Sequence, residues 1–466
     1  MHHSNPGRRA RQIETLRSQF AQADGLPFAD VLTAERLDRA LHDEKAHWRE
    51  AVYTPLLTLW AFLSQVVNPD ASCRAAVARV LAWLVSRGER PCSPKTGPYC
   101  KARHRLPESL LHRLVRETGR ELHDRSPPAW LWNGRPVKIA DGTTVSMPDT
   151  AANQRDYPQN PSQAPGLGFP LARLVVVFSL ACGSVLEAAL GRYQGKQAGE
   201  NALLRTLADA FAPGDVLLGD RYFGGWFDLA FWLRRGVDVV VRLHQARHCD
   251  LRRGRRLGPD EHVVAWPRPD RPDWMDEATY QALPERLELR EVRVRVRHRG
   301  FRTRALVVVT TLLDATAYPA ADLAELYRLR WHAELDLRSL KETLGMDVLR
   351  CHSPAMVRKE VWAHLLSYNL IRAVLAAAAD DLGADPRELS FKGAVQAVTA
   401  FAERLREADG ATAAELSEWL LLMIGAHLVG DRPGRAEPRA RKRRSNQYPL
   451  LMQPRDEARK KLLHSC

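Results

Sequence analysis

The hydrophobic pattern of this sequence changes twice along the chain, and this change limits the possible folds more than any other feature. Up to about Pro128, apolar residues recur at helical spacing, as in "TAERLDRALHDEKAHWREAVYTPLLTLWAFLSQVV". From "PVKIADGTTVSMPDT" onward, short apolar runs of strand length alternate with helical segments. From about Val361 to Leu428 the pattern is helical again. We therefore expect an α/β core with a helical region on either side in the sequence.

The central part of the chain contains a second kind of β pattern. The run "FPLARLVVVFSLACGSVLEAALGRY" predicts a hairpin around its Cys-Gly-Ser turn, whereas "LELREVRVRVRHRGFRTRALVVVTTL" alternates with period two over a long stretch. We interpret the latter as extra β-structure added to the main sheet. The expected organisation is a helical region over 1–128, a core over 129–244, a β-rich insertion over 245–304, the second part of the core over 305–380, and a helical C-terminal region with a basic tail over 381–466.

The charge balance favours a polyanionic partner. In 466 residues, Lys and Arg exceed Asp and Glu by 69 − 55, which gives a net charge of +14. Much of the surplus lies in the tail "RPGRAEPRARKRRSNQYP", which predicts binding to a nucleic-acid backbone; the alternative is a solubilising tail.

Cysteine and apolar patterns bear on the compartment. The seven cysteines form no CxxC pair and show no zinc-ligand spacing with His, so we expect reduced thiols and no metal at cysteine. The N-terminus lacks the apolar core of a signal peptide, and the most apolar runs are too short or too polar to span a bilayer. We expect a soluble cytoplasmic protein that associates with the nucleoid when it binds DNA, without a membrane partner.

One predicted helix carries an unusual set of polar residues. In "YPAADLAELYRLRWHAELDLRSLKETLGM", a residue advances about 100° per position, which places Tyr327, Arg330, Glu334 and Lys341 within an arc of roughly 60°. Leucines form an adjoining apolar stripe that can pack on a core. Two other acids, Asp336 and Glu342, fall outside the polar arc, and we do not assign them to it.

Three carboxylates stand where they could perform chemistry together. Asp141 is predicted to end the strand "VKIA", Asp220 follows the strand "VLLG", and Glu334 lies on the helix just described. Each also has an ordinary structural interpretation: a turn residue before glycine, a turn cap, and half of a surface ion pair. Two acids at the ends of adjacent strands, with a third on a packing helix, can hold two divalent metals for attack on a phosphodiester.

These residues carry a resemblance to a known family. The spacing Tyr327-x2-Arg330-x3-Glu334-x6-Lys341 resembles the Tyr-Arg-Glu-Lys signature of bacterial insertion-sequence transposases of the DDE class, in the family named after insertion sequence four. The segments "DGTTVSMPDT" and "GDVLLGDRYF" look like the first and second acidic motifs of that family. The resemblance covers most of the chain.

The resemblance implies a fold, an activity and partners. It implies a ribonuclease H-like core with a β-rich insertion, Asp141 on the first strand and Asp220 after the fourth. Asp141, Asp220 and Glu334 would be the catalytic metal ligands for two Mg²⁺ or Mn²⁺ ions. The enzyme would cleave double-stranded DNA at the inverted repeats of a transposon and join the ends to target DNA, as a homodimer in the DNA complex.

Further residue roles follow from the same resemblance. Tyr327, Arg330 and Lys341 would bind phosphates near the cleavage site, which suits a phenol, a bidentate guanidinium and an ammonium. Some members of the family cleave the second strand through a hairpin, with a flipped base stacked on a tryptophan of the insertion. Trp266 and Trp274 are the candidates in this chain, and packing or loop roles are the alternative for both.

Two other functions stay open at this stage. One is a ribonuclease H-like nuclease or resolvase that cuts DNA without strand transfer. The other is a DNA-binding protein that has lost catalysis. Three acids facing a polyanion argue against the second, because without metal they would repel phosphate.

Overall fold

The computed structural model describes residues 34–43, 52–86, 88–196, 198–295, 305–408, 410–429 and 450–464. Its contacts divide the chain into two compact units. The helical unit comprises Met1–Trp130, Ala181–Glu187 and Leu335–Val429, and the sheet unit comprises Leu131–Leu180, Ala188–Glu334 and Gly430–Cys466. The basic segment 430–449, part of the predicted DNA-binding tail, lies outside the described residues.

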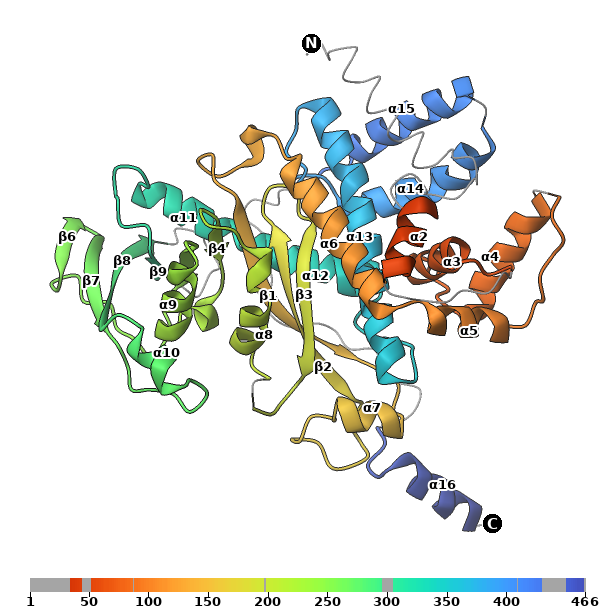
Figure 1. The fold of residues 1–466 in the computed structure, drawn as a ribbon, viewed down its shortest axis with the longest axis horizontal. Helices are drawn as coiled ribbons and strands as arrows, with labels where there is room; N and C mark the ends of the chain where they lie inside the picture. Colours follow the sequence, from red (N-terminus) through yellow and green to blue (C-terminus); the bar gives the residue numbers. More distant parts are fainter. Residues whose placement is uncertain are drawn as a thin grey trace. The chain divides into compact units, whose positions relative to one another are not determined.

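Nine strands of the described chain form one sheet, in the order β3-β2-β1-β4-β5-β9-β8-β7-β6 (Figure 1). Strand β1 pairs antiparallel with β2 and parallel with β4, and β4 pairs parallel with β5. The predicted hairpin is confirmed as β2 and β3, since neighbouring strands joined by so short a turn must run antiparallel. The strands are β1 (Val137–Ser146), β2 (Leu171–Ser179), β3 (Val185–Arg192), β4 (Val216–Leu218), β5 (Asp238–Arg242), β6 (Arg255–Gly258), β7 (Glu261–Pro267), β8 (Arg286–Arg295) and β9 (Ala305–Thr310).

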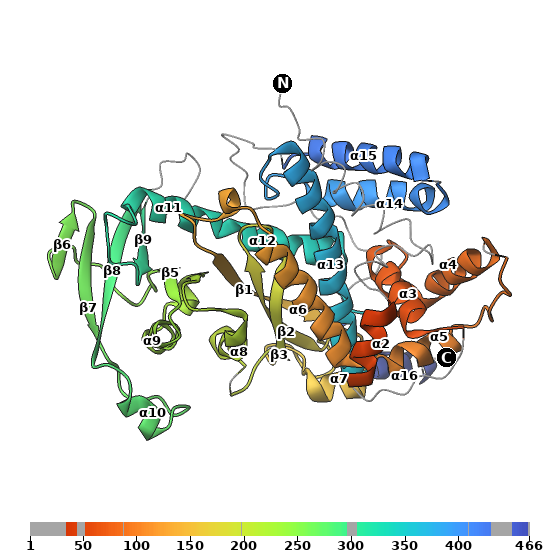
Figure 2. The same cartoon turned by 45° about the horizontal axis from the view of Figure 1, so that its top comes forward.

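The alternating segment of the sequence extends this sheet. Strands β6, β7 and β8 pair antiparallel in succession, and β8 pairs with β9, which pairs with β5. Figure 2 shows these strands running outward from β5 to β6 at the far end of the sheet. Extra β-structure is therefore added to the main sheet, as the period-two pattern predicts.

The sheet unit also contains helices on and between the strands. Apolar residues of β1, β4, β5, β8 and β9 form one buried cluster with Leu323 and Leu326 of α11, so α11 packs on the sheet. The described helices of this unit are α7 (Ala151–Asp156), α8 (Glu200–Thr206), α9 (Trp226–Arg234), α10 (Glu277–Gln281), α11 (Ala320–Leu329) and α16 (Arg455–His464), with short 3-10 turns at Ala208–Ala210 (η2) and Arg221–Phe223 (η3).

The helix expected around Tyr327 is not continuous. Helix α11 ends at Leu329, α12 covers Trp331–Arg338, and a π-helical turn follows at Ser339–Thr343. At the break, the Arg330 N–H bonds to the Tyr327 carbonyl, and the Ala333 N–H bonds to the Arg330 carbonyl, both in tight i to i−3 contacts. Tyr327, Arg330 and Glu334 still lie together, since Arg330 pairs with Glu334 at i+4 and acts on the hydroxyl of Tyr327. The turn and the π-helix each change the angular phase, so a uniform step of 100° does not apply along the whole segment. Of the five leucines of the predicted stripe, Leu326, Leu337, Leu340 and Leu344 are buried, and Leu329 is half-buried against the apolar cluster of the sheet.

The helical unit is built around helix α13 (Pro354–Leu382). This helix packs along α6 and contacts α3 and α15, and α14 lies beside α15 (Figure 2). Among the described helices, α13 alone is long and apolar enough to cross a membrane, but 83% of its most apolar window is buried inside the protein, as in a core helix. The remaining helices are α2 (Ala34–Asp43), α3 (Pro55–Val67), α4 (Cys73–Ser86), α5 (Gly97–Arg105), α6 (Glu108–Asp124), η1 (Pro128–Trp130), α14 (Phe391–Glu407) and α15 (Gly410–Ala426).

Candidate active site

Strand register brings the first two predicted acids together. Strands β1 and β4 pair in parallel with Ile139 opposite Leu218. Asp141 and Asp220 each come two residues after this last pair, Asp141 within β1 and Asp220 beyond the end of β4. They are close enough that the charge of Asp220 raises the pKa of Asp141. Adjacent strands lie about 4.8 Å apart, and side chains two residues apart point to the same face. The two acids lie near each other because each follows the Ile139–Leu218 pair by the same number of residues.

Asp141 does not end its strand, which corrects the prediction. Strand β1 continues to Ser146 because β2 pairs with it along its whole length, with Asp141 opposite Val176. The "DGT" segment is thus extended strand and not a turn. Gly142 allows the Glu200 side chain to pack closely against the strand, since a Cβ on this residue would lie 2.4 Å from Cδ of Glu200. The Gly142 N–H donates to Oδ1 of Asp141 at 2.8 Å, which fixes the carboxylate.

Asp220 begins a short helical turn. Its Oδ1 accepts a hydrogen bond of 2.6 Å from the Tyr222 N–H, so it caps the 3-10 turn Arg221–Phe223. The turn is held from outside by Asn201 of α8, which donates to the Tyr222 carbonyl at 2.7 Å and to Asp228 at 3.0 Å. The capping interpretation of Asp220 is correct, and it still leaves one carboxylate oxygen available for another contact.

Arg330 connects the third acid to the first. Its guanidinium lies 2.5 Å from Oε1 of Glu334 and 3.7 Å from Oδ2 of Asp141. Its position at the break between α11 and α12 lets one side chain face both carboxylates. Glu334, in the first turn of α12, is more accessible than Asp141, with 37% of its side chain exposed against 17%. Glu334 thus forms the i, i+4 ion pair that its ordinary interpretation predicts, and its partner Arg330 also contacts Asp141.

The electrostatics of the site show too little positive charge for its carboxylates. Burial raises the pKa of Asp141 to about 6, and the charges of Asp220 and Glu334 add to the rise. The Gly142 N–H and Arg330 oppose the rise without cancelling it. Burial likewise raises the pKa of Tyr327, with Arg330 and Asp220 acting on its hydroxyl in opposite directions.

A fourth carboxylate, which the sequence analysis missed, belongs to the same neighbourhood. Glu200, the first residue of α8, lies against Gly142, and burial raises its pKa with a further contribution from Asp220. Its partner is Arg173 of β2, with Nε 4.0 Å from Oε1. The sequence gives a weak signal only, since an acid in the first turn of a helix is common for its interaction with the helix dipole.

Arg242 is a second residue that the sequence analysis missed. It ends β5, and its charge acts on Tyr327. Tyr327 and Arg330 are therefore part of a basic and phenolic group beside the acids. Lys341 lies in the π-helical turn within the helical unit and is half-buried.

The two candidate tryptophans differ sharply. Trp266 on β7 is buried, and its Nε1 donates to Oε1 of Glu291 at 3.1 Å. Trp274 is 48% exposed, with the guanidinium of Arg205 over its ring at 4.3 Å. Of the two, Trp274 is the one that a nucleic-acid base could reach without rearrangement of the insertion.

The residues at this site fit a hard divalent cation. Asp141, Asp220 and Glu334 offer only carboxylate oxygens, the ligands that Mg²⁺ and Mn²⁺ prefer. Burial is the main cause of the raised pKa of Asp141, and the charges of Asp220 and Glu334 add a smaller contribution. A cation among them would lower that pKa and remove the repulsion.

Comparison with known proteins gives a consistent result along the chain. The family described as "Transposase DDE domain" matches residues 132–370, just over half of the chain. The transposase InsG for insertion sequence element IS4 of Escherichia coli (strain K12) is 25% identical over 430 residues, covering 90% of this chain and 92% of InsG. The transposase for insertion sequence element IS421 of Escherichia coli is 35% identical over 74 residues, covering 16% of this chain and 20% of the relative.

Among solved structures, a cryo-EM structure of the piggyBac transposase synaptic complex with hairpin DNA is similar at a TM-score of 0.41. The two chains share 10% sequence identity, and the alignment covers 90% of this chain and 87% of the other.

Proposed function

The chain belongs to the family of transposases with a DDE domain, and from this premise we propose that Asp141, Asp220 and Glu334 are its catalytic carboxylates. A member of this family is a DNA transposase, an enzyme that cleaves DNA and transfers the cut strand. The observation that carries the residue assignment is the parallel register of β1 and β4, together with Arg330, which contacts both Asp141 and Glu334.

DDE transposases generally use divalent metal ions, and we propose Mg²⁺ or Mn²⁺, with two ions held by these three residues. Carboxylate oxygens alone form the donor set, which supports a hard cation over zinc. When bound, such ions lower the pKa of the attacking water or 3′-hydroxyl and stabilise the leaving oxygen.

The other residues of the site would then act on the DNA backbone. Arg330 is shared between two acids in the present structure, and a cation at those acids would release its guanidinium to bind a phosphate as a bidentate fork. Tyr327 and Arg242 stand beside it and would add a hydroxyl donor and a second cation. Lys341 is assigned to phosphate binding from its place in the Tyr-Arg-Glu-Lys spacing.

We extend the proposal to fold and assembly. Asp141 on the first strand and Asp220 directly after the fourth, in the sheet order β3-β2-β1-β4-β5, support a ribonuclease H-like core. The partners would be the inverted repeats at the transposon ends and a target duplex. Pairing of two ends requires two active sites, so we propose a homodimer on DNA that acts in the cytoplasm on nucleoid DNA.

The test begins with the DNA on either side of the coding sequence. Short matching inverted repeats outside both ends would supply the substrate. Pre-cleaved ends, a supercoiled target plasmid and Mg²⁺ are incubated with the full chain, and joined products are separated on a gel. We expect excision from a donor plasmid and joining into the target, as in cut-and-paste transposition. Cutting without any joined product would instead identify a nuclease or resolvase.

A further inference from the structure

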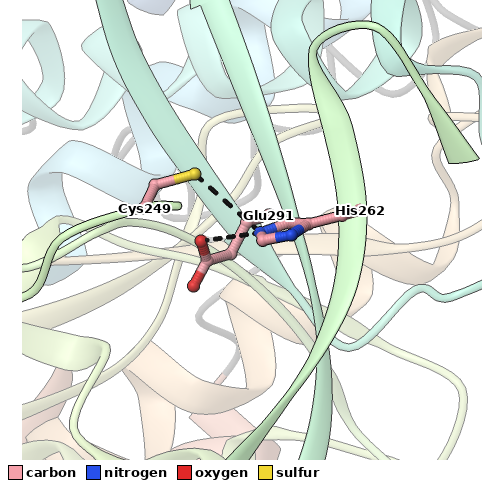
Figure 3. A group of neighbouring side chains, drawn as sticks. All are labelled: Cys249, His262 and Glu291. Carbon is pink, nitrogen blue, oxygen red and sulfur yellow. Dashed lines mark hydrogen bonds and ion pairs between the residues drawn. The ribbon is translucent and has the colours of Figure 1, made fainter. Parts of the chain in front are cut away.

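A second group of potential metal ligands lies in the insertion, at the Cys-His-Glu cluster formed by Cys249, His262 and Glu291. One ligand atom from each residue lies within 4.8 Å of the others. Figure 3 shows the three side chains converging, with interactions from Cys249 and from Glu291 to the imidazole of His262.

The fold places these residues together from three separate segments. His262 on β7 and Glu291 on β8 are direct partners across an antiparallel pair, which brings their side chains to the same face. Cys249 comes from the connection between β5 and β6. His262 and Glu291 are buried and Cys249 is half-buried. A separation of 13 and then 29 residues explains why no metal-ligand spacing is visible in the sequence.

The hydrogen bonds of His262 leave one ring nitrogen, Nε2, facing Cys249 and Glu291, two residues whose side chains can bind metals. Its Nδ1 lies 2.6 Å from the Arg253 carbonyl oxygen, which can only accept, so Nδ1 carries the proton. In a neutral imidazole, Nε2 is then a lone pair. That nitrogen lies 3.0 Å from Oε2 of Glu291, which is an acceptor in its charged form, and 3.9 Å from Sγ of Cys249. A second proton or a metal ion is needed to reconcile these groups.

We propose that the Cys-His-Glu cluster is a zinc site, with Sγ of Cys249, Nε2 of His262 and Oε2 of Glu291 as ligands. At a tetrahedral zinc, bond lengths of about 2.3 Å to sulfur and 2.0–2.1 Å to nitrogen put those two ligand atoms roughly 3.6 Å apart. The observed 3.9 Å is close to that separation. A mixed sulfur, nitrogen and oxygen donor set selects zinc over Mg²⁺, and the fourth position is available to water. Binding releases the thiol proton of Cys249 to solvent.

The groups around the cluster orient its ligands in the manner of a metal centre. The Arg253 carbonyl accepts from Nδ1 and thereby fixes the tautomer of His262. The Trp266 indole N–H donates to Oε1 of Glu291 at 3.1 Å, which leaves Oε2 directed at His262.

A zinc ion here would join the β5–β6 connection to the β7–β8 pair. The same connection places the Arg247 guanidinium over the Trp266 ring at 3.9 Å. The ion would therefore stabilise the insertion and is separate from the carboxylate site in its ligands and in its metal. The zinc site does not depend on the assignment of the chain as a transposase.

The test uses the full chain and zinc alone. The purified protein is stripped with a chelator, titrated with Zn²⁺ and analysed for bound metal; Co²⁺ is then substituted for spectroscopy. We expect one tightly bound zinc per chain, a sulfur-to-cobalt charge-transfer band, and visible bands of tetrahedral intensity. In the unsubstituted chain, zinc should also protect Cys249 from alkylation, as located by peptide mass spectrometry, which needs no variant.

Matched variants distinguish the two metal sites. Cys249→Ser should abolish the charge-transfer band, and His262→Gln should weaken zinc binding at least tenfold. Cys92→Ser, at another half-buried cysteine, and Asp141→Asn should leave the band unchanged. Zinc binding that survives Cys249→Ser and His262→Gln but is lost in Asp141→Asn would overturn the proposal. Failure of zinc to protect Cys249 would overturn it as well and leave a buried His–Glu ion pair in its place.

Discussion

Two acid centres in this chain show opposite relations between burial and charge. Asp336 of α12 is 1% exposed, and its carboxylate is bound by Arg372 and Arg387, with a further hydrogen bond of 2.8 Å from the Tyr368 hydroxyl. Burial alone would raise its pKa, but the two guanidinium groups hold the pKa of Asp336 below its ordinary value. Asp141 is 17% exposed, yet its pKa is raised to about 6.

The difference lies in the number of partners. Asp336 has two arginines to itself, whereas Asp141 shares one arginine with Glu334 and also faces Asp220. A carboxylate held with full compensation contributes to the fold. A group of carboxylates held with too little compensation costs stability and is retained where a cation or a reaction requires it. The contrast therefore separates a structural acid from a functional one within a single helix, since Glu334 and Asp336 are both in α12.

The largest expected effect is on catalysis. Asp220→Ala should lower both DNA cleavage and strand transfer by at least about a thousandfold, since several kcal/mol of transition-state stabilisation depend on the metal ligands. The rate is measured with labelled transposon ends and Mg²⁺. Glu342→Gln is the matched control, because Glu342 is exposed and forms a surface ion pair with Arg338. Full cleavage by Asp220→Ala would refute the metal-site assignment.

The second effect is on stability and concerns the compensated centre. Asp336→Ala leaves two buried guanidinium groups without their counter-ion, which should cost about 3–5 kcal/mol in the free energy of unfolding. Urea unfolding followed by circular dichroism measures the loss. Gly183 packs against both guanidinium groups, since a Cβ there would lie within 3 Å of Arg372 and of Arg387. A loss under 1 kcal/mol would show that Asp336 is not the structural acid of this pair.

The third prediction is that removing a carboxylate charge from the functional centre stabilises the protein, whereas removing one from the structural centre destabilises it. With the pKa of Asp141 at about 6 against an ordinary 3.8, the folded state binds more protons than the unfolded state within that window. The contribution of this carboxyl to the free energy of unfolding is fully present below pH 3.8 and is lost as the pH rises to about 6. Asp141→Asn should therefore make the metal-free protein more stable by about 1–3 kcal/mol at neutral pH, while abolishing cleavage.

The pH profile provides the check on this reversal. Urea unfolding in a chelator at several pH values should show the advantage of Asp141→Asn shrinking toward pH 4 and absent below it. Added Mg²⁺ should stabilise the unsubstituted chain and not the variant. An advantage that is equal at all pH values would mean that packing, rather than charge, causes the difference.

Much of the acid site could be predicted from the sequence, because the positions of its acids depend on neighbouring residues in the chain. An apolar run followed at once by an acid predicts a carboxylate at the end of a strand pairing, and the parallel register of β1 and β4 turns two such runs into neighbours. The distinction between Glu334 and Asp336 is also local, since their positions on one helix differ by two residues. Asp141 was wrongly expected to end its strand because partner β2, which extends it, lies further along the chain.

Other features could not be predicted because their causes are tertiary. The break at Arg330 has no Gly or Pro to signal it in "ELYRLRWHAEL". It coincides with the ion pairs of Arg330 to Asp141 and Glu334, which no local pattern contains. The zinc proposal has the same origin, since Cys249, His262 and Glu291 meet only when β7 pairs with β8.

The smallest effect tests whether Glu200 belongs with the uncompensated acids. Its pKa is raised by burial and by Asp220, but Arg173 partly compensates it. Glu200→Gln keeps the shape and removes the charge, so we expect cleavage to fall only about tenfold, with a shift in the Mg²⁺ concentration needed for half-maximal rate.

Gly142→Ala supplies the matched geometric test of the same contact. Its Cβ would displace the Glu200 carboxyl, while leaving both charges in place. If Glu200 acts through its position beside Asp141, the two substitutions should not be additive, and the double variant should resemble Glu200→Gln alone. Independent, additive losses would place Glu200 outside the site, since a displaced carboxylate would then matter separately from its charge. Glu200 would in that case resemble Asp336, an acid whose partner is an arginine and whose role is structural.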